Sequence, residues 1–289
     1  MTTLYVCDLD GTLLGPDARP SEFTRETLND LVQDGVAITV ATARSLVSLR
    51  RVTGGLDLRG PAVVYGGAFV VELATGVTLV ERVLNPALVD RVLGAFGRLG
   101  VAPLVYSVDA VDTDASGALH ADTVGWVAGS ESPGIAWYLG DRGQDPRFRP
   151  VGHAHELRRD GTFSIVAIAP EDELRPVVDV LRSEFAGEVA VSLQEETYLP
   201  GVFWLELAAP GATKGDGIAD LRRLTGADRV VCFGDNRNDL SMFAAADESY
   251  AVANAGPEVK ARATGVIESN AADGVAHWLA ANARVGSRR

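Results

Sequence analysis

The sequence is short of the features that stabilise small secreted proteins. It has only two cysteines, Cys7 and Cys232, in 289 residues, which excludes a disulfide framework as the source of its stability. Each cysteine lies inside a predicted buried strand and has no His or basic neighbour in the sequence that would activate its thiol. Both are therefore predicted to be small buried hydrophobic residues in a reducing compartment.

Positive charge is scarce as well. The chain has 26 Lys and Arg residues against 39 Asp and Glu residues, which gives a net charge of −13 at pH 7. This balance argues against nucleic acid or an anionic membrane as a partner. An anionic substrate would need positive charge supplied locally, by a metal ion or by a few Lys and Arg side chains. Composition predicts no interface, so the oligomeric state stays open.

Long hydrophobic runs are also missing. A membrane-spanning helix needs about 20 apolar residues, whereas the longest runs here, such as residues 36–43, have the length of a strand. Residues 1–3 lead straight into a predicted strand rather than into a signal peptide. A cytoplasmic protein is expected, and its length and 47% hydrophobic content suit two soluble domains.

The first part of the chain alternates strands and helices. Residues 4–7, 36–41 and 61–65 are apolar runs that predict strands buried on both faces of a sheet. Ser21 and Gly35 mark the start and end of a helix between the first two of these strands. This alternation predicts an α/β fold with a doubly wound parallel sheet, in which ligands bind beyond the carboxyl ends of the strands.

From residue 84 the pattern changes to that of an α+β insert. Helices are predicted after Asn85-Pro86 and after Pro170, and an antiparallel sheet with helices on one face is expected. Residues 129–159 receive no assignment. The predicted strands of the insert are residues 104–108, 122–128, 162–169 and 188–193. The α/β pattern returns at residues 202–207, so the predicted domains are a core of residues 1–83 and 202–289 and an insert of residues 84–201.

Two acids stand at the end of the first predicted strand, in the segment Asp8-Leu9-Asp10-Gly11-Thr12. Gly11 lets the chain leave the strand sharply, so both carboxyl groups can lie over the same point. Crowded acids repel each other unless a cation lies between them or one of them is protonated, and this predicts a reactive or metal-binding site. The alternative is an ordinary Asp-Gly turn.

Further polar residues follow other elements of the α/β pattern: Thr42, Lys214, Asp235, Asn238 and Asp239. Because the ends of parallel strands meet at one edge of the sheet, these side chains are expected to converge with the first two acids. Carboxylates with other oxygen donors suit Mg²⁺ rather than zinc. A carboxylate beside Mg²⁺ can attack phosphorus to form an aspartyl-phosphate, a second acid can act as general acid and base, and Lys and Thr can bind phosphoryl oxygens.

This set of motifs resembles the haloacid dehalogenase (HAD) superfamily of phosphohydrolases. The segment from Asp8 to Thr12 is similar to its first motif, Thr42 to its second, Lys214 to its third and residues 234–239 to its fourth. The chain further resembles the Cof-like subfamily, whose α/β cap domain of the C2B type lies between the second and third motifs. That likeness is carried by Thr42-Ala43-Arg44, Lys214-Gly215, Met242, Asn254-Ala255 and Asp273-Gly274-Val275. Ala43 stands where the subfamily has Gly, and Gly66 where it often has Asn.

The resemblance implies a Rossmann-like core with an inserted cap and a role for each candidate residue. Asp8 would be the nucleophile and Asp10 the general acid and base. The implied Mg²⁺ set is Asp8, Asp10 through its backbone carbonyl, Asp235 and Asp239, with Asp239 behind the direct ligands. Thr42 and Lys214 would hold the phosphoryl group and Asn238 would orient neighbouring groups. The remaining implied substrate- and phosphate-binding residues are Leu9, Gly11, Ala43 and Arg44.

The expected function is that of a Mg²⁺-dependent phosphatase acting on a small phosphorylated metabolite, through an aspartyl-phosphate. A sugar phosphate, a nucleotide and a cofactor phosphate all remain open as the substrate. A phosphomutase of the same fold is the first alternative, followed by a dehalogenase and a non-catalytic phospholigand-binding protein.

The insert contributes weaker candidates. His153, His155 and Glu156 have the residue types of a metal set, although a surface loop is the expected explanation. Trp126 and Trp137 are expected in the core of the insert, with a substrate-facing position as the alternative.

Overall fold

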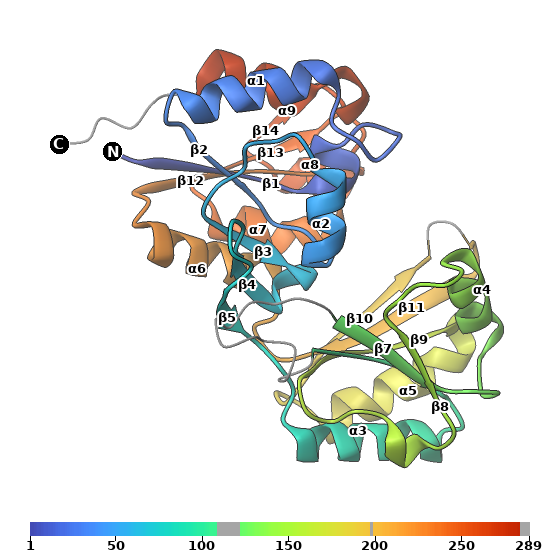
Figure 1. Cartoon of the computed structure of the whole chain (residues 1–289). Helices are drawn as coiled ribbons and strands as arrows, with labels where there is room; N and C mark the ends of the chain where they lie inside the picture. Colours follow the sequence, from blue (N-terminus) through green and yellow to red (C-terminus); the bar gives the residue numbers. More distant parts are fainter. Residues whose placement is uncertain (109–121, 197–198, 284–289) are drawn as a thin grey trace. The chain divides into compact units, whose positions relative to one another are not determined.

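The computed structural model describes residues 1–108, 122–196 and 199–283, which form two compact units (Figure 1). One unit, called the core here, comprises residues 1–81 and 212–283. The other, called the insert, comprises the described residues between Arg82 and Gly211. The insert therefore interrupts the core once.

The core is built on a five-stranded sheet in the order β14-β13-β12-β1-β2. Every pair of neighbouring strands in it is parallel, which confirms the predicted doubly wound α/β fold. The central strand β1 lies between β12 and β2, so its carboxyl end is flanked on both sides by other strand ends. The strands are β1 (Thr3–Cys7), β2 (Ala37–Val40), β12 (Arg229–Gly234), β13 (Glu248–Val252) and β14 (Gly265–Ile267).

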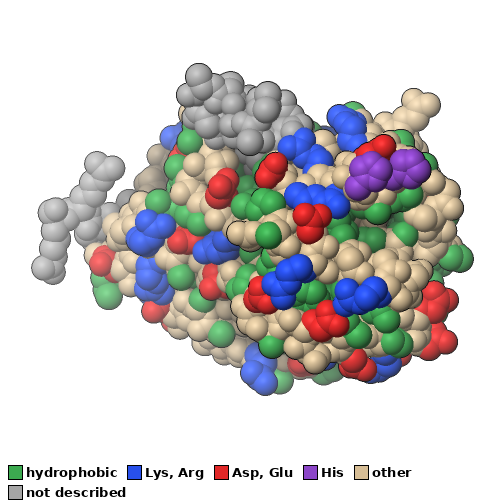
Figure 2. All heavy atoms as spheres, turned by 90° about the horizontal axis from the view of Figure 1, so that it is seen from below, with side chains coloured by type: hydrophobic (Ala, Val, Ile, Leu, Met, Phe, Trp, Pro, Cys, Tyr) green, Lys and Arg blue, Asp and Glu red, His purple; other side chains and the backbone are tan. Residues whose placement is uncertain are grey.

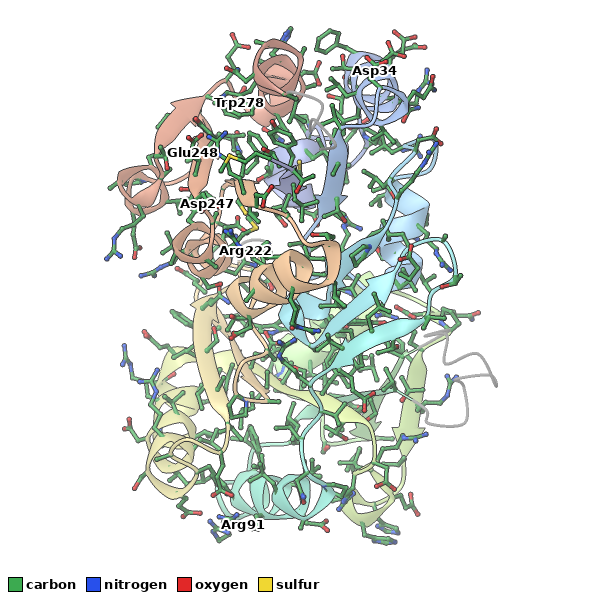
Figure 3. All side chains as sticks on the ribbon, turned by 90° about the vertical axis from the view of Figure 1, so that its left-hand side faces the viewer. Asp34, Arg91, Arg222, Asp247, Glu248 and Trp278 are labelled. Carbon is green, nitrogen blue, oxygen red and sulfur yellow. The ribbon has the colours of Figure 1, made fainter. Side chains whose placement is uncertain are left out.

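Helices cover both faces of this sheet (Figure 1). Helix α1 packs beside α9, whose Trp278 contacts the rings of Tyr5, Phe233 and Tyr250. Helix α6 packs beside α7, and its Arg222 forms an ion pair of 2.6 Å with Asp247 (Figure 3). The helices are α1 (Glu22–Gln33), α2 (Leu46–Val52), α6 (Lys214–Thr225), α7 (Leu240–Ala245), α8 (Pro257–Arg262) and α9 (Gly274–Asn282), with short turns η1 (Leu9–Leu13), η2 (Tyr65–Gly67), η4 (Arg237–Asp239) and η5 (Asn270–Ala272).

Side-chain caps set the starts of three core helices. The hydroxyl of Ser21 accepts from the Thr24 amide, that of Ser45 from the Ser48 amide, and that of Thr213 from the Asp216 amide. The predicted start of the first helix at Ser21 is thus confirmed. The same rule places Lys214 as the first residue of α6.

A second, smaller sheet belongs to the core. It holds β3 (Pro61–Val64), β4 (Phe69–Glu72) and β5 (Thr78–Glu81) in antiparallel pairs. The strand predicted at residues 61–65 is therefore present, but it pairs mainly within this sheet. A parallel bridge between Ala41 and Val63 and a hydrogen bond from the Thr42 amide to the Val63 carbonyl (3.0 Å) connect it to the end of β2.

The insert contains a six-stranded sheet in the order β10-β11-β9-β6-β7-β8. Its pairs are antiparallel except for β7 with β8. Helices α3 and α5 pack beside each other and α4 packs on β9, where Ile135 and Tyr138 join a cluster with Val166 and Ile168. The elements are α3 (Pro86–Arg98), β6 (Leu104–Val108), β7 (Asp122–Val127), α4 (Pro133–Asp141), β8 (Phe148–Val151), η3 (Ala154–Glu156), β9 (Thr162–Pro170), α5 (Glu171–Glu184), β10 (Ala190–Glu195) and β11 (Val202–Ala208).

One sequence assignment is wrong. Residues 202–207, predicted to resume the parallel sheet of the core, form β11 and pair antiparallel with both β9 and β10 of the insert. A short apolar run fits a central strand of either sheet, so its hydrophobicity alone did not distinguish them. Residues 129–159, left unassigned, contain α4, β8 and η3.

No helix within the described ranges is long and apolar enough to cross a membrane. Acidic and basic side chains are interspersed over the face of the molecule shown in Figure 2. On that face the described residues form no extended area of a single charge.

Candidate active site

The end of β1 and the turn η1 carry the two predicted acids. Gly11 has a φ of +76°, and a Cβ atom at this position would lie 2.5 Å from Oδ2 of Asp235, so only glycine fits. Thr12 donates its hydroxyl hydrogen to Oδ1 of Asp235 at 2.8 Å. The turn after Asp8 therefore lies directly against Asp235, which follows β12.

A buried ion triad lies at this edge of the sheet. Lys214 Nζ donates to Oδ1 of Asp8 and to Oδ1 of Asp239, each at 2.6 Å. The three side chains are only 2%, 7% and 0% exposed, respectively. Lys214 opens α6, so its ammonium and the positive end of the helix both favour anionic neighbours. The structure thus brings together three of the residues selected from the sequence.

Asp239 has a supporting position in this triad. Its second oxygen, Oδ2, accepts hydrogen bonds from the backbone amides of Asp235 and Asn236, both at 2.9 Å. With Oδ1 bound to Lys214, both oxygens of Asp239 already have partners. Asp239 therefore fixes the lysine and the loop after β12.

Burial raises the pKa values of two carboxyl groups, and crowded negative charge adds to the rise. Burial raises the pKa of Asp8 to about 8, and the nearby carboxylates of Asp239 and Asp235 add to this rise, whereas the Lys214 ammonium opposes it. Burial also raises the pKa of Asp235, against the hydrogen bond from Thr12. Both carboxyl groups are held where an additional positive charge would stabilise their ionised forms.

The donor set fits a divalent cation. Asp8, Asp235 and Asp239 each offer a carboxylate oxygen, and these atoms lie within 4.8 Å of one another. Three ionised carboxylates face one ammonium, so two negative charges would remain for a cation to neutralise. Oxygen donors of this kind suit Mg²⁺. Because both oxygens of Asp239 are engaged, Asp8 and Asp235 are the side chains best placed to bind it.

A second group of side chains consists of Thr42 and Arg44, which follow β2, and Asp10, which lies in the turn η1 after β1. The Thr42 side chain is buried at the end of β2, and its hydroxyl oxygen accepts from the Arg44 amide at 3.1 Å. The Arg44 guanidinium donates Nε to Oδ2 of Asp10 (2.7 Å) and Nη2 to Oδ1 (2.6 Å). Its Nη1 also donates to Oγ of Ser48 at 2.8 Å. The exposed carboxylate of Asp10 is therefore held in a two-pronged ion pair.

The remaining predicted binding residues offer mainly backbone. The Leu9 side chain is fully buried, so only its main chain can face a ligand. Ala43 and Asn238 are exposed, and the carbonyl of Asn238 accepts from the Ser241 hydroxyl at 3.1 Å. The structure does not bring the Asn238 side chain into the carboxylate cluster by any hydrogen bond among the described residues.

The loop at Gly66-Gly67 supports the same edge of the sheet. Gly67 has a φ of +116°, and a Cβ atom there would lie 2.2 Å from the carbonyl oxygen of Thr213, the residue before Lys214. The Gly66 amide donates to the Thr42 carbonyl at 3.0 Å. Gly66 supplies no side chain where the resembling subfamily often has Asn, so its contribution here is through the backbone.

Sequence reasoning missed several hydroxyl groups that hold the site. Thr12 was quoted only as part of a motif, and Ser48 and Ser241 were not selected. Ser48 lies four residues after Arg44, but Arg44 precedes α2 and its N-cap Ser45, so helical spacing does not indicate this contact. Ser241 accepts from the Gly215 amide at 3.1 Å, a contact between α6 and α7 that no local pattern indicates.

The candidates in the insert have structural partners. The rings of His153 and His155 stack with centroids 5.4 Å apart, and Glu156 accepts from the Gly152 and His153 amides. These residues do not form a metal-binding group among the described residues. Trp126 is buried in the cluster under α4 and donates to Glu131 at 2.7 Å, whereas Trp137 packs half-buried against that cluster.

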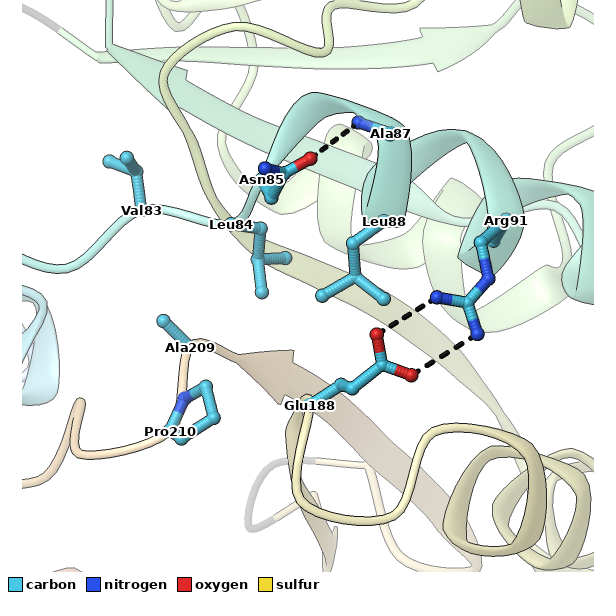
Figure 4. A pocket seen from close by; sticks show the side chains of 9 residues that line it. All are labelled: Val83, Leu84, Asn85, Ala87, Leu88, Arg91, Glu188, Ala209 and Pro210. Carbon is cyan, nitrogen blue, oxygen red and sulfur yellow. Dashed lines mark hydrogen bonds and ion pairs between the residues drawn. The ribbon is translucent and has the colours of Figure 1, made fainter.

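A cavity of about 410 Å³ lies in the insert (Figure 4). Leu84 and Leu88 form part of its apolar wall, and its two charged residues, Arg91 and Glu188, pair with each other at 2.8 Å. None of the predicted site residues lines this cavity. A smaller one of about 300 Å³ in the core, between Leu4 and Thr225, also contains none of them.

Comparison with known proteins shows which protein family matches this chain. A family model described as haloacid dehalogenase-like hydrolase matches residues 5–279. HMP-PP phosphatase of Cronobacter sakazakii is 26% identical over 96% of this chain and 95% of its own length. The 5-amino-6-(5-phospho-D-ribitylamino)uracil phosphatase of Bacillus subtilis is also 26% identical, over 94% and 95%.

Solved structures share this fold over nearly the full length of the chain. The crystal structure of a Thermotoga maritima protein matches with a TM-score of 0.78 at 25% identity, covering 98% of both chains. A haloacid dehalogenase-like hydrolase from Bacteroides thetaiotaomicron matches with a TM-score of 0.76 at 23% identity, covering 96% of this chain and 98% of its own. The arrangement of a parallel-sheet core with an insert thus recurs in other proteins.

Proposed function

Because the chain belongs to the haloacid dehalogenase-like hydrolases, we propose that it is a Mg²⁺-dependent phosphatase that hydrolyses a small phosphorylated metabolite through an aspartyl-phosphate. The observation that carries this proposal is the buried Asp8, bound to Lys214 on one side and close to Asp235 on the other. A nucleophilic carboxylate needs this combination of a fixed position and compensating positive charge.

The family, the α/β fold and the enzyme class predicted from the sequence motifs are confirmed by the match over residues 5–279 and by relatives named as phosphatases. The names of these relatives specify small phosphorylated compounds as substrates of those proteins. They support a substrate of similar size here. The domain limits remain a proposal: we place the insert between residues 82 and 211, with β11 inside it.

In the first step, an oxygen of Asp8 attacks phosphorus and the bond from phosphorus to the leaving oxygen breaks. Lys214 holds Oδ1 of Asp8, which fixes the carboxylate at the end of β1. Asp10 donates a proton to the leaving oxygen, as a general acid does when an alkoxide departs. Arg44 keeps the Asp10 carboxyl group in one orientation before substrate arrives.

In the second step, Asp10 accepts a proton from water and the resulting hydroxide attacks the phosphorus of the aspartyl-phosphate. Phosphate leaves and Asp8 is regenerated, so the atoms and protons balance over the cycle. The hydroxyl of Thr42 and the ammonium of Lys214 are the groups available to bind the non-bridging oxygens, and the guanidinium of Arg44 would join them by giving up a bond to Asp10 or Ser48. Such donors stabilise the charge of the transferring group.

Asp8, Asp235 and the backbone carbonyl of Asp10 are the groups that we propose hold Mg²⁺, with Asp239 supporting them through Lys214 and the loop after β12. When bound, the ion would draw charge from the phosphoryl oxygens and neutralise the carboxylates that face them. Thr12 orients Asp235 for this role.

The direct test is phosphate release from a panel containing a sugar phosphate, a nucleotide, flavin mononucleotide and pyridoxal phosphate, with Mg²⁺ or with a chelator. We expect release that requires Mg²⁺ and that falls by at least about a hundredfold after chelation, with recovery when Mg²⁺ is restored. Folded protein that releases no phosphate, or that works equally without metal, would contradict the proposal. Formation of a phosphorylated isomer without free phosphate would instead favour a phosphomutase.

A further inference from the structure

Two asparagine side chains donate hydrogen bonds to the turn that carries Asp10. Asn254 donates from Nδ2 to the carbonyl oxygen of Gly11 at 2.8 Å. The Oδ1 atom of Asn254 in turn accepts from the backbone amide of Asn270 at 3.1 Å. Asn270 donates from its own Nδ2 to the carbonyl oxygen of Leu14 at 2.9 Å. The two side chains thus form one chain of hydrogen bonds along the turn η1.

The turn held in this way has irregular backbone. Asp10 (φ −72°, ψ 122°) and Gly11 (φ 76°, ψ −3°) both depart from helical angles within η1. Backbone bonds from Leu13 to Asp8 (3.3 Å) and from Leu14 to Leu9 (2.9 Å) close the turn around these residues, and the carbonyl of Gly11 inside it is held by the Asn254 side chain. The position of the Gly11 peptide sets where the preceding residue, Asp10, directs its carboxyl group.

The two asparagines that hold this turn come from parts of the chain that have no other role in the proposed chemistry. Asn254 follows β13 and Asn270 follows β14, and their bonds to the turn span 243 and 256 residues of sequence. Both loops lie at the carboxyl ends of their strands. This is the edge of the sheet where β1 delivers Asp8.

From this geometry we propose that Asn254 and Asn270 are positioning residues, which hold the Asp10 turn in its working orientation and thereby set the rate of turnover. The proposal rests on the function proposed above. Arg44 holds the Asp10 carboxylate from the side of β2, and the asparagines hold its backbone from the side of β13. A general acid has to stay within hydrogen-bond reach of its proton acceptor, and small misplacements reduce rates strongly.

The competing explanation is that these asparagines only fasten two loops to the core. Asn29 provides a matched control, because it makes the same two kinds of bond away from the site. Its Nδ2 donates to the Gly55 carbonyl at 2.9 Å and its Oδ1 accepts from the Asp57 amide at 2.8 Å. A purely structural role predicts that Asn254→Ala and Asn29→Ala behave alike.

The experiment compares steady-state kinetics and melting temperatures of Asn254→Ala, Asn270→Ala and Asn29→Ala with those of the unmodified protein, using an aryl phosphate at saturating Mg²⁺. We expect kcat to fall about tenfold or more in Asn254→Ala, with KM changed by less than about twofold. Asn29→Ala should keep its kcat while losing a similar amount of thermal stability. Asn270→Ala leaves the bond to Gly11 in place, so its loss of kcat should be smaller.

The double variant Asn254→Ala/Asn270→Ala adds a test that does not depend on any single substitution. Residues acting through one turn should give a combined loss of kcat smaller than the product of the two separate losses. An unchanged kcat in folded Asn254→Ala, or a fall equal to that of Asn29→Ala, would overturn the proposal; should Asn254→Ala not fold, an unchanged kcat in Asn270→Ala would do so. Inactivity of the unmodified protein would contradict the proposed phosphatase function.

Discussion

Each unit of the molecule contains an ion triad in which one cation holds two carboxylates. In the core, Lys214 holds Asp8 and Asp239, each at 2.6 Å. In the insert, Arg147 holds Asp122 at 3.0 Å and Asp145 at 2.7 Å, just where β7 and β8 begin. In both triads two carboxylates share one positively charged side chain, but the surrounding residues differ.

The core triad has a third acid beside it, whereas the residues that the structure describes give the insert triad no such acid. Asp235 lies close enough to share a cation with Asp8, and Gly11 lets the backbone pass against it. Arg147 instead ties a strand start to a turn, and no group of metal-binding side chains surrounds it among the described residues. A buried ion triad is therefore not a site by itself; an unneutralised acid beside it is what suggests chemistry.

The largest expected difference between the triads is the loss of activity when the aspartate at the strand of each triad is replaced by asparagine. Asp8→Asn should lower phosphatase activity by at least about a thousandfold, because the amide cannot act as the nucleophile. Its thermal stability without metal should change little, because burial and the neighbouring carboxylates disfavour the negative charge that this substitution removes. Asp122→Asn, in the insert, should keep kcat. Equal activities of the two variants would refute the distinction.

Replacing the positively charged residue of each triad should lower the free energy of unfolding by different amounts. Lys214→Met leaves two buried carboxylates without their cation and should cost about 3–5 kcal/mol of unfolding free energy, together with most of the activity. Arg147→Met should cost less, about 1–3 kcal/mol, because Arg147 is 25% exposed, and its kcat should be retained. Denaturant unfolding and phosphate release measure both effects. A stable, active Lys214→Met variant would contradict the role of the core triad.

A two-pronged arginine–carboxylate pair occurs in both units as well. Arg44 holds Asp10 in the core, and Arg91 holds Glu188 in the insert through bonds of 2.8 and 3.1 Å. Arg44→Lys, which cannot form the planar double contact, should reduce kcat/KM about tenfold. Arg91→Lys should leave both the kinetics and the melting temperature essentially unchanged, because its pair is exposed. Similar kinetics for the two variants would remove Arg44 from the site.

The smallest expected effect comes from a lone acid of the insert. Burial raises the pKa of Glu206, against a hydrogen bond of 2.9 Å from Ser164 that lowers it. Between the ordinary and the raised pKa, the folded protein holds a proton that the unfolded chain has released, so the free energy of unfolding falls as pH rises through that window. Glu206→Gln should flatten this dependence, with a change of no more than about 1 kcal/mol. Ser164→Ala should steepen it, and identical pH profiles for all three proteins would exclude the effect.

The sequence was most informative where chemistry needs particular residues at short spacing. Asp8, Lys214, Asp235 and Asp239 were selected from local motifs, and the parallel order of the core strands explains why they meet. Their assigned roles remain proposals. The contact between Arg44 and Asp10 could not be read from sequence, because it depends on how β2 is placed beside β1.

The sequence was least informative where only hydrophobicity was available. Residues 202–207 have the pattern of a central strand and are assigned to the wrong sheet, since the choice of partner depends on β9 and β10 lying beside them. Asn254 was noted as part of a family pattern, but its bond to Gly11 spans 243 residues and leaves no local trace. Contacts between segments far apart in the sequence are thus what sequence alone leaves out in both units.

The most direct test of the account is to detect the phosphoryl group on Asp8. Asp10→Asn should still be phosphorylated by an aryl phosphate, whose leaving group needs no proton, but should hydrolyse the intermediate slowly. Mass spectrometry of protein quenched in acid should then show one added phosphoryl group on the peptide containing Asp8, and none in the Asp8→Asn/Asp10→Asn protein. Phosphate release from Asp10→Asn with no label on Asp8, or a label on another residue, would contradict the central claim.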